Sequence, residues 1–269
     1  MKDIITFGSI VVDLVLNPPK LPAPGETVTS TSYALLPGGK GANQAYAAAK
    51  SDPTSKSKVV MVGAVGDDAL RKLALDDLEE ANVDVSSVNL RKDLPTACAA
   101  VCVDAKGENQ IIVGSAANQS VSMQQLPPLD SEKVLLMQME IPHDQNWAAV
   151  KAAYSAGATT VINVAPAGPV PADTLRMLDY VIVNELEACT LAEHVGLSVE
   201  GQSETELGRQ IAMLYGTTVV VTLGANGAAV FVPADTEEAG GGFPLRATLK
   251  ATALKVRVSP QGHLEGHRA

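Results

Sequence analysis

The sequence is poor in aromatic residues and carries an excess of acidic charge. Of its 269 residues only 3% are aromatic, and the formal net charge is −10. A surface with this charge repels nucleic acid and anionic membranes, and few aromatic rings are present for base stacking. We therefore expect a protein with no nucleic-acid partner and no membrane partner.

Paired cysteines and long apolar segments are also lacking. Cys98, Cys102 and Cys189 form no CxxC pair and no metal-ligand spacing with histidine, so we interpret them as small buried apolar side chains in a reducing compartment. The longest early apolar run, 4–16, contains Asp13 and lacks a basic flank, which argues against a signal peptide and a membrane span. Together these absences predict a soluble cytoplasmic protein.

Short β-rich runs alternate with helical stretches along the chain, and no linker divides it. This order is typical of one domain in which helices cover both faces of a mostly parallel sheet. Helix N-caps are predicted at Asp67 and at Ser203, the second in a capping box with Glu206. Strands are predicted at 4–10, 59–62, 134–138, 160–163, 180–183 and 219–223, and helices near 41–50, 67–81, 144–156, 172–178, 185–193 and 203–215.

Two segments, about 14–36 and 96–114, interrupt this alternation. Turn-forming residues divide each segment, and we predict antiparallel strands in both. Because these strands fall outside the βαβ series, we expect them to form a second, smaller sheet. It would lie across the C-terminal edge of the main sheet, where open α/β folds bind ligands.

The most informative segment is Pro-Gly-Gly-Lys-Gly-Ala-Asn-Gln at 37–44, which runs into an Ala-rich helix. Its glycines allow the backbone to approach a neighbour closely, and the first turn of the helix presents free N–H groups to whatever docks there. A lone Gly-Gly pair more often only turns the chain. The length of this string and its context favour a binding role.

A series of short motifs follows in register along the chain. They are FGSIVVD at 7–13, PGET at 24–27, GGKGANQ at 38–44, GAVGDD at 63–68, AAN at 116–118, LMQME at 136–140, NVAPA at 163–167, NELE at 184–187 and TLGANG at 222–227. Each motif is weak alone, but as an ordered set they resemble the ribokinase (PfkB) family of carbohydrate kinases. The resemblance implies an α/β, three-layer αβα fold of ribokinase type over residues 1–258, with a mostly parallel central sheet and a small β-sheet lid.

One group of residues matches the sugar site of that family. Asp13 ends the first predicted strand, where a carboxylate can accept hydrogen bonds from two sugar hydroxyls, although a strand-terminal Asp also commonly makes a turn. Glu140 follows a predicted strand and is expected at the sheet edge, with a plain surface acid as the alternative. A solvated charge is the alternative for Lys40. The resemblance assigns sugar binding to Val11, Asp13, Gly39, Lys40, Gly41, Asn43 and Glu140.

Val11 departs from the family pattern. It stands where members of the family often carry a polar residue, so one expected hydrogen bond to the sugar is missing. This departure weakens the prediction of ribose as the specific substrate more than it weakens the prediction of the family.

A second group matches the nucleotide side. Asn184 follows a strand and is predicted to cap the next helix, and the resemblance assigns to Glu187 the organisation of Mg²⁺ and phosphate through water. No GxxxxGK[ST] string occurs in the sequence. We interpret the motif at 63–68 as a structural turn from a strand to a helix. The residues expected to bind the nucleotide are Asn184, Thr222, Gly224, Ala225 and Gly227.

The resemblance fails at the C-terminus. The family carries an Asp-Thr-x-Gly-Ala-Gly-Asp string there, which supplies an anion hole and the catalytic aspartate. In this chain the strand-like run 254–258 leads instead into a polar tail at 259–269, and no aspartate follows Asp235. We interpret the tail as the product of a truncation or frame shift, and no catalytic residue can be identified. His263 and His267 follow no strand that would hold a base at the sheet edge.

The resulting functional hypothesis is ATP-dependent phosphorylation of a sugar hydroxyl, with D-ribose to ribose 5-phosphate as first choice and inefficient turnover in this chain. The alternatives are a non-catalytic sugar- or nucleotide-binding pseudokinase and a kinase for another sugar or a nucleoside. The resemblance implies ATP, Mg²⁺ and K⁺ as cofactors, with the K⁺ site lost together with the C-terminal string. It also implies a homodimer formed through the lid, because an exposed antiparallel edge needs cover.

Overall fold

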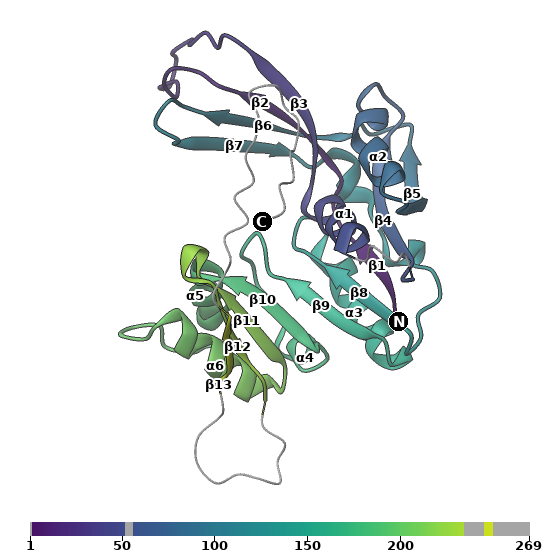
Figure 1. The fold of residues 1–269 in the computed structure, drawn as a ribbon, viewed down its shortest axis with the longest axis vertical. Helices are drawn as coiled ribbons and strands as arrows, with labels where there is room; N and C mark the ends of the chain where they lie inside the picture. Colours follow the sequence, from purple (N-terminus) through teal and green to yellow (C-terminus); the bar gives the residue numbers. More distant parts are fainter. Residues whose placement is uncertain (1, 52–55, 234–244, 250–269) are drawn as a thin grey trace.

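The chain folds into a large central sheet with helices on both faces and a smaller sheet that projects from one end (Figure 1). The computed structural model describes residues 2–51, 56–233 and 245–249, the last range by its backbone alone. The expected α/β fold with a mostly parallel sheet and a β-sheet lid is confirmed.

The central sheet has nine strands in the order β13-β12-β11-β10-β9-β8-β1-β4-β5. All neighbours from β11 to β5 are parallel, and the pairs β11–β12 and β12–β13 are antiparallel. The carboxyl ends of the parallel strands therefore meet at one edge. The strands are β1 (Asp3–Phe7), β4 (Val59–Gly66), β5 (Asp84–Arg91), β8 (Lys133–Met137), β9 (Thr159–Asn163), β10 (Tyr180–Asn184), β11 (Thr218–Thr222), β12 (Ala228–Phe231) and β13 (Leu245–Leu249).

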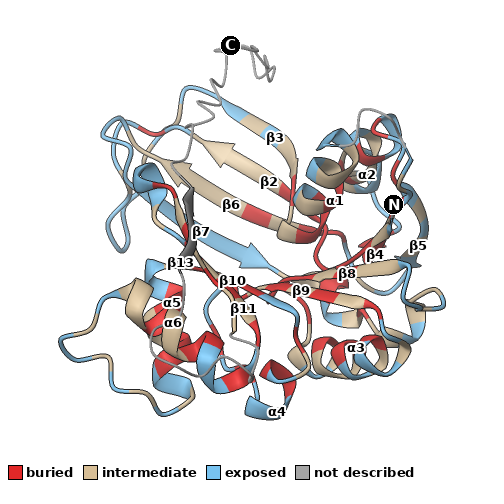
Figure 2. Ribbon diagram, turned by 60° about the horizontal axis from the view of Figure 1, so that its bottom comes forward, coloured by how far each residue is buried: buried red, intermediate tan, exposed pale blue. Residues whose placement is uncertain are grey.

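Helices cover the two faces unequally. Helices α1 and α2 contact β1, β4 and β5, whereas α3, α5 and α6 contact strands from β8 to β12 on the opposite face (Figure 2). Two hydrophobic cores result, one on each face. The helices are α1 (Lys40–Ser51), α2 (Leu70–Glu80), α3 (His143–Ala156), α4 (Ala172–Leu175), α5 (Glu185–His194) and α6 (Glu204–Tyr215), with short 3-10 helices η1 (Ala116–Ser120), η2 (Met123–Gln125) and η3 (Gly224–Asn226).

The smaller sheet, called the lid below, consists of β2 (Val11–Leu16), β3 (Tyr33–Gly38), β6 (Ala97–Val103) and β7 (Asn109–Gly114). Its order is β3-β2-β6-β7. The expected segments do build it, but the chain from 17 to 32 lies between strands, and the central pair β2–β6 is parallel rather than antiparallel. The reason is that β2 follows β1 and β6 follows β5, so both hairpins leave the same edge of the main sheet through their first strands, which therefore run in the same direction.

The predicted strand at 4–10 is wrong in one respect that matters for the site. β1 ends at Phe7, and the chain passes through Gly8, Ser9 and Ile10 before it enters β2 of the lid. Asp13 therefore lies within β2 and does not end a strand of the main sheet. Only Gly8 and Ser9 interrupt the apolar residues across this junction, so the sequence pattern suggested one continuous strand and did not reveal the change of sheet.

The helix termini confirm some of the predicted caps. Ser203 Oγ accepts the Glu206 N–H at 3.3 Å, but the Glu206 carboxylate binds Arg209 instead of completing a capping box. Asp67 is not an N-cap, because β4 extends to Gly66 and α2 begins only at Leu70. The three cysteines are free and half-buried rather than fully buried.

Gly208 provides a test of the packing of α6 on the sheet. A glycine inside a helix is ordinarily about 1 kcal/mol worse than alanine. At Gly208, however, a Cβ would lie 2.5 Å from Cγ2 of the buried Val221 on β11. Valine has little rotamer freedom, and overpacking of this kind costs about 1–3 kcal/mol, so we expect Gly208→Ala to lower the free energy of unfolding.

Urea unfolding followed by circular dichroism measures the effect. Leu214→Ala, at an exposed position of the same helix, is the matched control and should change the free energy of unfolding by less than about 0.5 kcal/mol. A Gly208→Ala protein more stable than the parent would show that α6 does not pack against β11 as described.

Candidate functional site

The glycine-rich turn meets the junction between β1 and β2 at very close range. A Cβ on Gly41 would lie 2.6 Å from the backbone N of Ser9, and Gly39 has a φ of +90°. The Ala42 N–H donates to the Ser9 carbonyl at 2.9 Å. Side chains at these glycines would push the two segments apart, so the motif is needed to seat the first turn of α1 against the end of β1.

The Glu140 carboxylate connects this turn to the end of β8. Oε2 accepts hydrogen bonds from Ser9 Oγ at 2.6 Å and from the Lys40 N–H at 2.9 Å, and Oε1 lies 3.4 Å from Lys40 Nζ. A carboxylate at the first N–H groups of a helix is favourably placed with respect to the helix dipole. Glu140 is therefore bound on both carboxylate oxygens, and Lys40 is paired with it although the lysine side chain is 40% exposed; a role of either residue in sugar binding stays a prediction.

Asp13 lies on the lid strand β2, and its carboxylate occupies the space left by a glycine. A Cβ on Gly38 would lie 2.4 Å from Asp13 Oδ2. Burial raises the pKa of Asp13 above its ordinary value of 3.8; the negative charge of Glu140 adds to this effect, and Lys40 opposes it. The three charged groups predicted from the sequence thus influence one another across the junction of lid and main sheet.

A cavity of about 330 Å³ opens beside these residues, below the lid strand β7 and at the end of β8. Of the predicted sugar-binding residues, Val11 and Glu140 line it directly. Asn43 is exposed on the first turn of α1 and is not part of the lining. The complete lining is Val11, Val113, Ser115, Asn118, Gln119, Met139, Glu140, Ile141, Pro142, His143 and Pro166.

Sequence reasoning missed most of this lining. Asn118 stands in the AAN motif, which carried no assigned role, and His143 lies three residues after Glu140 at the start of α3. Ser115 and Gln119 flank Asn118 but belong to no periodic pattern. Only the neighbourhood of a recognised motif could have pointed to them.

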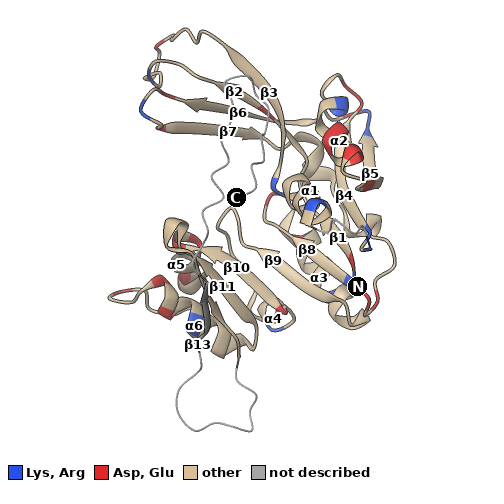
Figure 3. Cartoon of the chain, viewed as in Figure 1, with Lys and Arg blue, Asp and Glu red and all other residues tan. Residues whose placement is uncertain are grey.

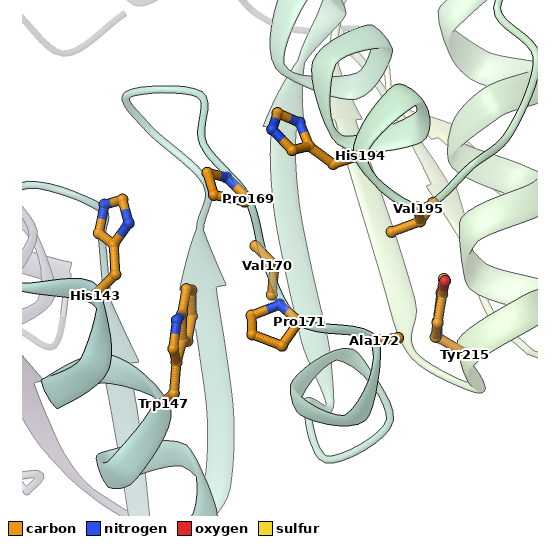
Figure 4. A pocket seen from close by; sticks show the side chains of 9 residues that line it. All are labelled: His143, Trp147, Pro169, Val170, Pro171, Ala172, His194, Val195 and Tyr215. Carbon is orange, nitrogen blue, oxygen red and sulfur yellow. The ribbon is translucent and has the colours of Figure 1, made fainter.

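A second cavity, of about 420 Å³, lies between α3 and the ends of α5 and α6 (Figure 4). His143 lines both cavities, and its ring centroid lies 5.9 Å from that of Trp147, the single tryptophan of the chain. No predicted site residue lies in the second cavity. Because Trp147 lies beside His143, which lines the first cavity, its fluorescence can report on changes in that cavity.

The predicted nucleotide residues gather at the carboxyl ends of two neighbouring strands. Asn184 and Thr222 are register partners on β10 and β11, and Thr222 Oγ1 donates to the Val183 carbonyl at 3.3 Å. The loop after β11 then turns through Gly224 and Gly227, with φ of +53° and +94°. Ala225 is exposed in this loop, within η3.

Asn184 and Glu187 form a reciprocal capping box at the start of α5. Asn184 Oδ1 accepts the Glu187 N–H, and Glu187 Oε2 accepts the Asn184 N–H, both at 2.8 Å. The predicted cap is confirmed. Glu187 is only 9% exposed, and within the described residues no group of three or more His, Cys, Asp or Glu side chains is placed to hold a metal ion. A role for Glu187 through Mg²⁺-bound water remains a prediction.

The two groups of residues are separated along the same edge of the sheet. β10 and β1 are separated by β9 and β8, and neighbouring strands lie about 4.8 Å apart, which places the strand ends roughly 14 Å from each other. The loop after β9 lies between them and contributes Pro166 to the first cavity.

The motif at 63–68 holds the lid rather than a ligand, which agrees with its structural interpretation. Asp68 Oδ2 accepts the Thr96 N–H at 2.6 Å and Oδ1 accepts Thr96 Oγ1–H at 2.8 Å, immediately before β6. Burial opposes ionisation of Asp68, but these hydrogen bonds outweigh it and lower its pKa. The expectations for 254–258 and 259–269 lie outside the described residues.

Comparison with known proteins agrees with this geometry. The model of the pfkB family carbohydrate kinases matches residues 1–248. The chain is 31% identical to ribokinase of Schizosaccharomyces pombe over 235 residues, covering 85% of this chain and 74% of that protein. Ribokinase of Bacillus subtilis is 33% identical over 202 residues, covering 74% of this chain and 67% of that protein.

Solved structures give the same result. Ribokinase of Thermotoga maritima has a TM-score of 0.77 at 25% identity and covers 95% of this chain, with 82% of that chain covered. Ribokinase of Arabidopsis thaliana, complexed with ribose and ATP, has a TM-score of 0.73 at 28% identity, covering 86% of this chain and 75% of that one. Among the described helices none is long and apolar enough to cross a bilayer. The fold, the motifs in register and these matches together show that the chain belongs to the PfkB family of carbohydrate kinases.

Proposed function

We propose that this chain binds ribose in the cavity beneath the lid and serves the ATP-dependent phosphorylation of a ribose hydroxyl to ribose 5-phosphate. The observation that carries the proposal is the convergence of Asp13, Lys40 and Glu140 where the lid, the first turn of α1 and the end of β8 meet. Support comes from the four relatives named above, which are ribokinases, one of them solved with ribose and ATP.

The charges of this cluster favour an unphosphorylated sugar. Two carboxylates offer acceptors for hydroxyl groups, and Lys40, which is paired with Glu140, is the one basic side chain among the predicted sugar residues. A phosphate ester would meet repulsion from Asp13 and Glu140. Val11 is 4% exposed and offers no hydrogen bond, so the cavity wall it forms suits the apolar face of the sugar.

The nucleotide is proposed to bind at the ends of β10 and β11, against Asn184, Thr222, Gly224, Ala225 and Gly227. The glycines let the backbone approach a flat base and its phosphates closely. Mg²⁺ would be held mainly by phosphate and water, as it usually is, with Glu187 acting on that water. When bound, the ion neutralises charge on the transferred phosphoryl group. K⁺ is proposed from the family resemblance alone.

A second candidate is a sugar- and nucleotide-binding protein with little turnover. The observation that favours it is that residues 259–265, which follow the strand-like run 254–258 where the family string is expected, read SPQGHLE and offer no match to the family aspartate that would accept the proton of the sugar hydroxyl. General-base catalysis contributes about 10²–10⁴-fold, which is the loss that this candidate predicts.

Asp13 should control pentose binding through its ionised form. We expect ribose to bind more tightly than fructose 6-phosphate or adenosine, and the affinity to fall as the pH decreases through the raised pKa of Asp13, because protonation removes an acceptor. Asp13→Asn should weaken binding by about 1.5–3 kcal/mol and remove this pH dependence. Calorimetry measures the affinity, and the emission of Trp147 follows binding through its contact with His143.

The same substitution has an opposite effect on stability, which serves as its control. Because the folded state holds the Asp13 proton more tightly than the unfolded state, the carboxyl destabilises the free protein as the pH rises above 3.8. The melting temperature of the Asp13→Asn protein at pH 7 should therefore be equal to or above that of the parent protein. Tightest binding of the phosphate ester would contradict the proposal.

Turnover separates the two candidates. In a coupled assay of ADP release with ribose, ATP, Mg²⁺ and K⁺, the second candidate predicts that the 269-residue chain binds ribose but turns over about 10²–10⁴-fold more slowly than the usual kinase range of about 1–100 s⁻¹. Asp13→Asn should raise the ribose concentration that gives half the maximal rate by the same factor as it weakens binding, and a ribose dependence that the substitution leaves unchanged would point to a contaminating kinase. A rate within the usual range would establish efficient ribose kinase activity and rule out the second candidate.

The lid is proposed to form a homodimer interface. Its four strands contain a single charged residue, Asp13, and Figure 3 shows the other lid charges at the turns. Large apolar side chains are nevertheless exposed on the edge strands, among them Tyr33 at 69%, Ile111 at 56% and Ile112 at 75%. Uncharged edges of this kind are normally covered.

Sedimentation velocity at micromolar concentration should show a dimer. Ile111 and Ile112 point to opposite faces of β7, so Ile111→Lys and Ile112→Lys identify the face involved, and the double variant should be monomeric. Leu186→Lys, at an exposed apolar position of α5 outside the lid, is the matched control and should remain dimeric. A monomeric parent protein would exclude the interface.

A further inference from the structure

Asn118 connects the segment that follows the last lid strand, β7, to the residue that precedes the first lid strand, β2. It lies in η1, directly after β7, and is 1% exposed. Its Oδ1 accepts the Ile10 N–H at 3.1 Å, and its Nδ2 donates to the Ile10 carbonyl at 2.9 Å. One side-chain amide thus makes the pair of hydrogen bonds that an adjacent strand would make.

Ile10 needs these bonds because it is fully buried between β1 and β2. Its relative exposure is 0%. It is the single residue between Ser9, which binds Glu140, and Val11, which lines the cavity proposed for the sugar. A buried backbone N–H and carbonyl without partners are costly. The amide of Asn118 therefore fixes the start of β2.

Helix η1 is itself anchored to a further lid connection. The Ala117 N–H donates to the Pro95 carbonyl at 3.0 Å, one residue before Thr96 and its contacts with Asp68. Ala116, the first residue of η1, has a φ of +39°, a left-handed conformation that is unfavourable for a residue with a side chain. Such a conformation persists only where surrounding contacts hold it.

We propose that Asn118 is a positioning residue for sugar binding, which sets the angle of the lid by clamping Ile10 and thereby places Asp13 opposite Glu140. The sugar readout rests on the function proposed above, whereas the clamp on the lid does not. Asp13 lies three residues after Ile10 on β2, so a shift at Ile10 is passed directly to its carboxylate.

Asn118→Asp tests the clamp at nearly constant shape. An ionised carboxylate still accepts the Ile10 N–H, but its second oxygen faces the Ile10 carbonyl and repels it. We expect ribose affinity about tenfold below that of the parent at pH 8. Burial raises the pKa of a carboxyl at this place, so the new Asp side chain should take up a proton as the pH is lowered to 5. The protonated carboxyl again donates to the Ile10 carbonyl, and the ratio of the two ribose affinities should therefore return towards one.

The ratio to the parent is the quantity to follow, because Asp13 titrates in both proteins. The titratable groups that face Asn118 across the cavity are Glu140 and His143. β4 and β6, which pack against η1, contribute only the thiols Cys98 and Cys102. None of these side chains is altered by the substitution, and a control that places a new charge elsewhere in the cavity separates the effect of that charge on them from the effect of the hydrogen bonds.

Two matched variants isolate the hydrogen bonds. Asn118→Leu keeps a similar volume but makes neither bond, and its loss of affinity should not recover at pH 5. Gln119→Glu places the same new charge one residue away in the same cavity without a bond to Ile10. Acidification restores no hydrogen bond to Ile10 in this variant, so the ratio of its ribose affinity to that of the parent should not approach one. Hydrogen exchange of the Val11–Leu16 amides should accelerate in Asn118→Leu relative to those of Val59–Gly66.

The outcomes are distinct. The positioning role is overturned if Asn118→Asp binds ribose with parental affinity at pH 8. It is also overturned if both Asn118 variants lose ribose affinity in proportion to their melting temperatures and neither recovers it at low pH. A parent protein that binds no ribose overturns the proposed function instead, and the clamp is then decided by exchange alone. Unchanged exchange of β2 in Asn118→Leu would overturn the clamp.

Discussion

The carboxylate of Glu140 is the interaction on which the sugar side of the molecule depends. It binds the Ser9 hydroxyl at the end of β1, the backbone N–H of Lys40 at the start of α1 and the Lys40 ammonium group, while its own backbone continues from β8. Three segments distant in sequence are therefore held by one side chain. The glycines at 39 and 41 follow from this constraint, because any larger residue would separate the segments that Glu140 brings together.

Sequence reasoning was most successful where a motif and a sheet edge coincide. Glu140, Asn184 and Thr222 were each expected at the carboxyl end of a parallel strand, and all three lie there because such ends share one edge. It failed between Phe7 and Val11, where only Gly8 and Ser9 mark the passage from one sheet to the other. It also missed β5, an edge strand whose sequence DVSSVNLR is too polar to stand out from a loop.

Residues that act through a single tertiary contact were beyond the reach of the sequence. Asn118 and His143 belong to no periodic pattern, and only the folded chain brings them to the wall of the cavity. Conversely, the residues expected to serve the nucleotide are already engaged in local structure, Asn184 and Glu187 with each other and Thr222 with the neighbouring strand. Capping chemistry and ligand chemistry use the same groups, so a motif alone does not separate the two roles.

The parallel pairing of β2 with β6 has a consequence for how the protein folds. The two hairpins of the lid are inserted far apart in the sequence, and the pair Val11–Ala97 closes a loop that contains α1, β4, α2 and β5. Loop-closure entropy disfavours such a contact until the intervening elements are in place. The lid is thus a late structure in assembly, and during synthesis its apolar first hairpin waits in an unpaired state until the second hairpin emerges.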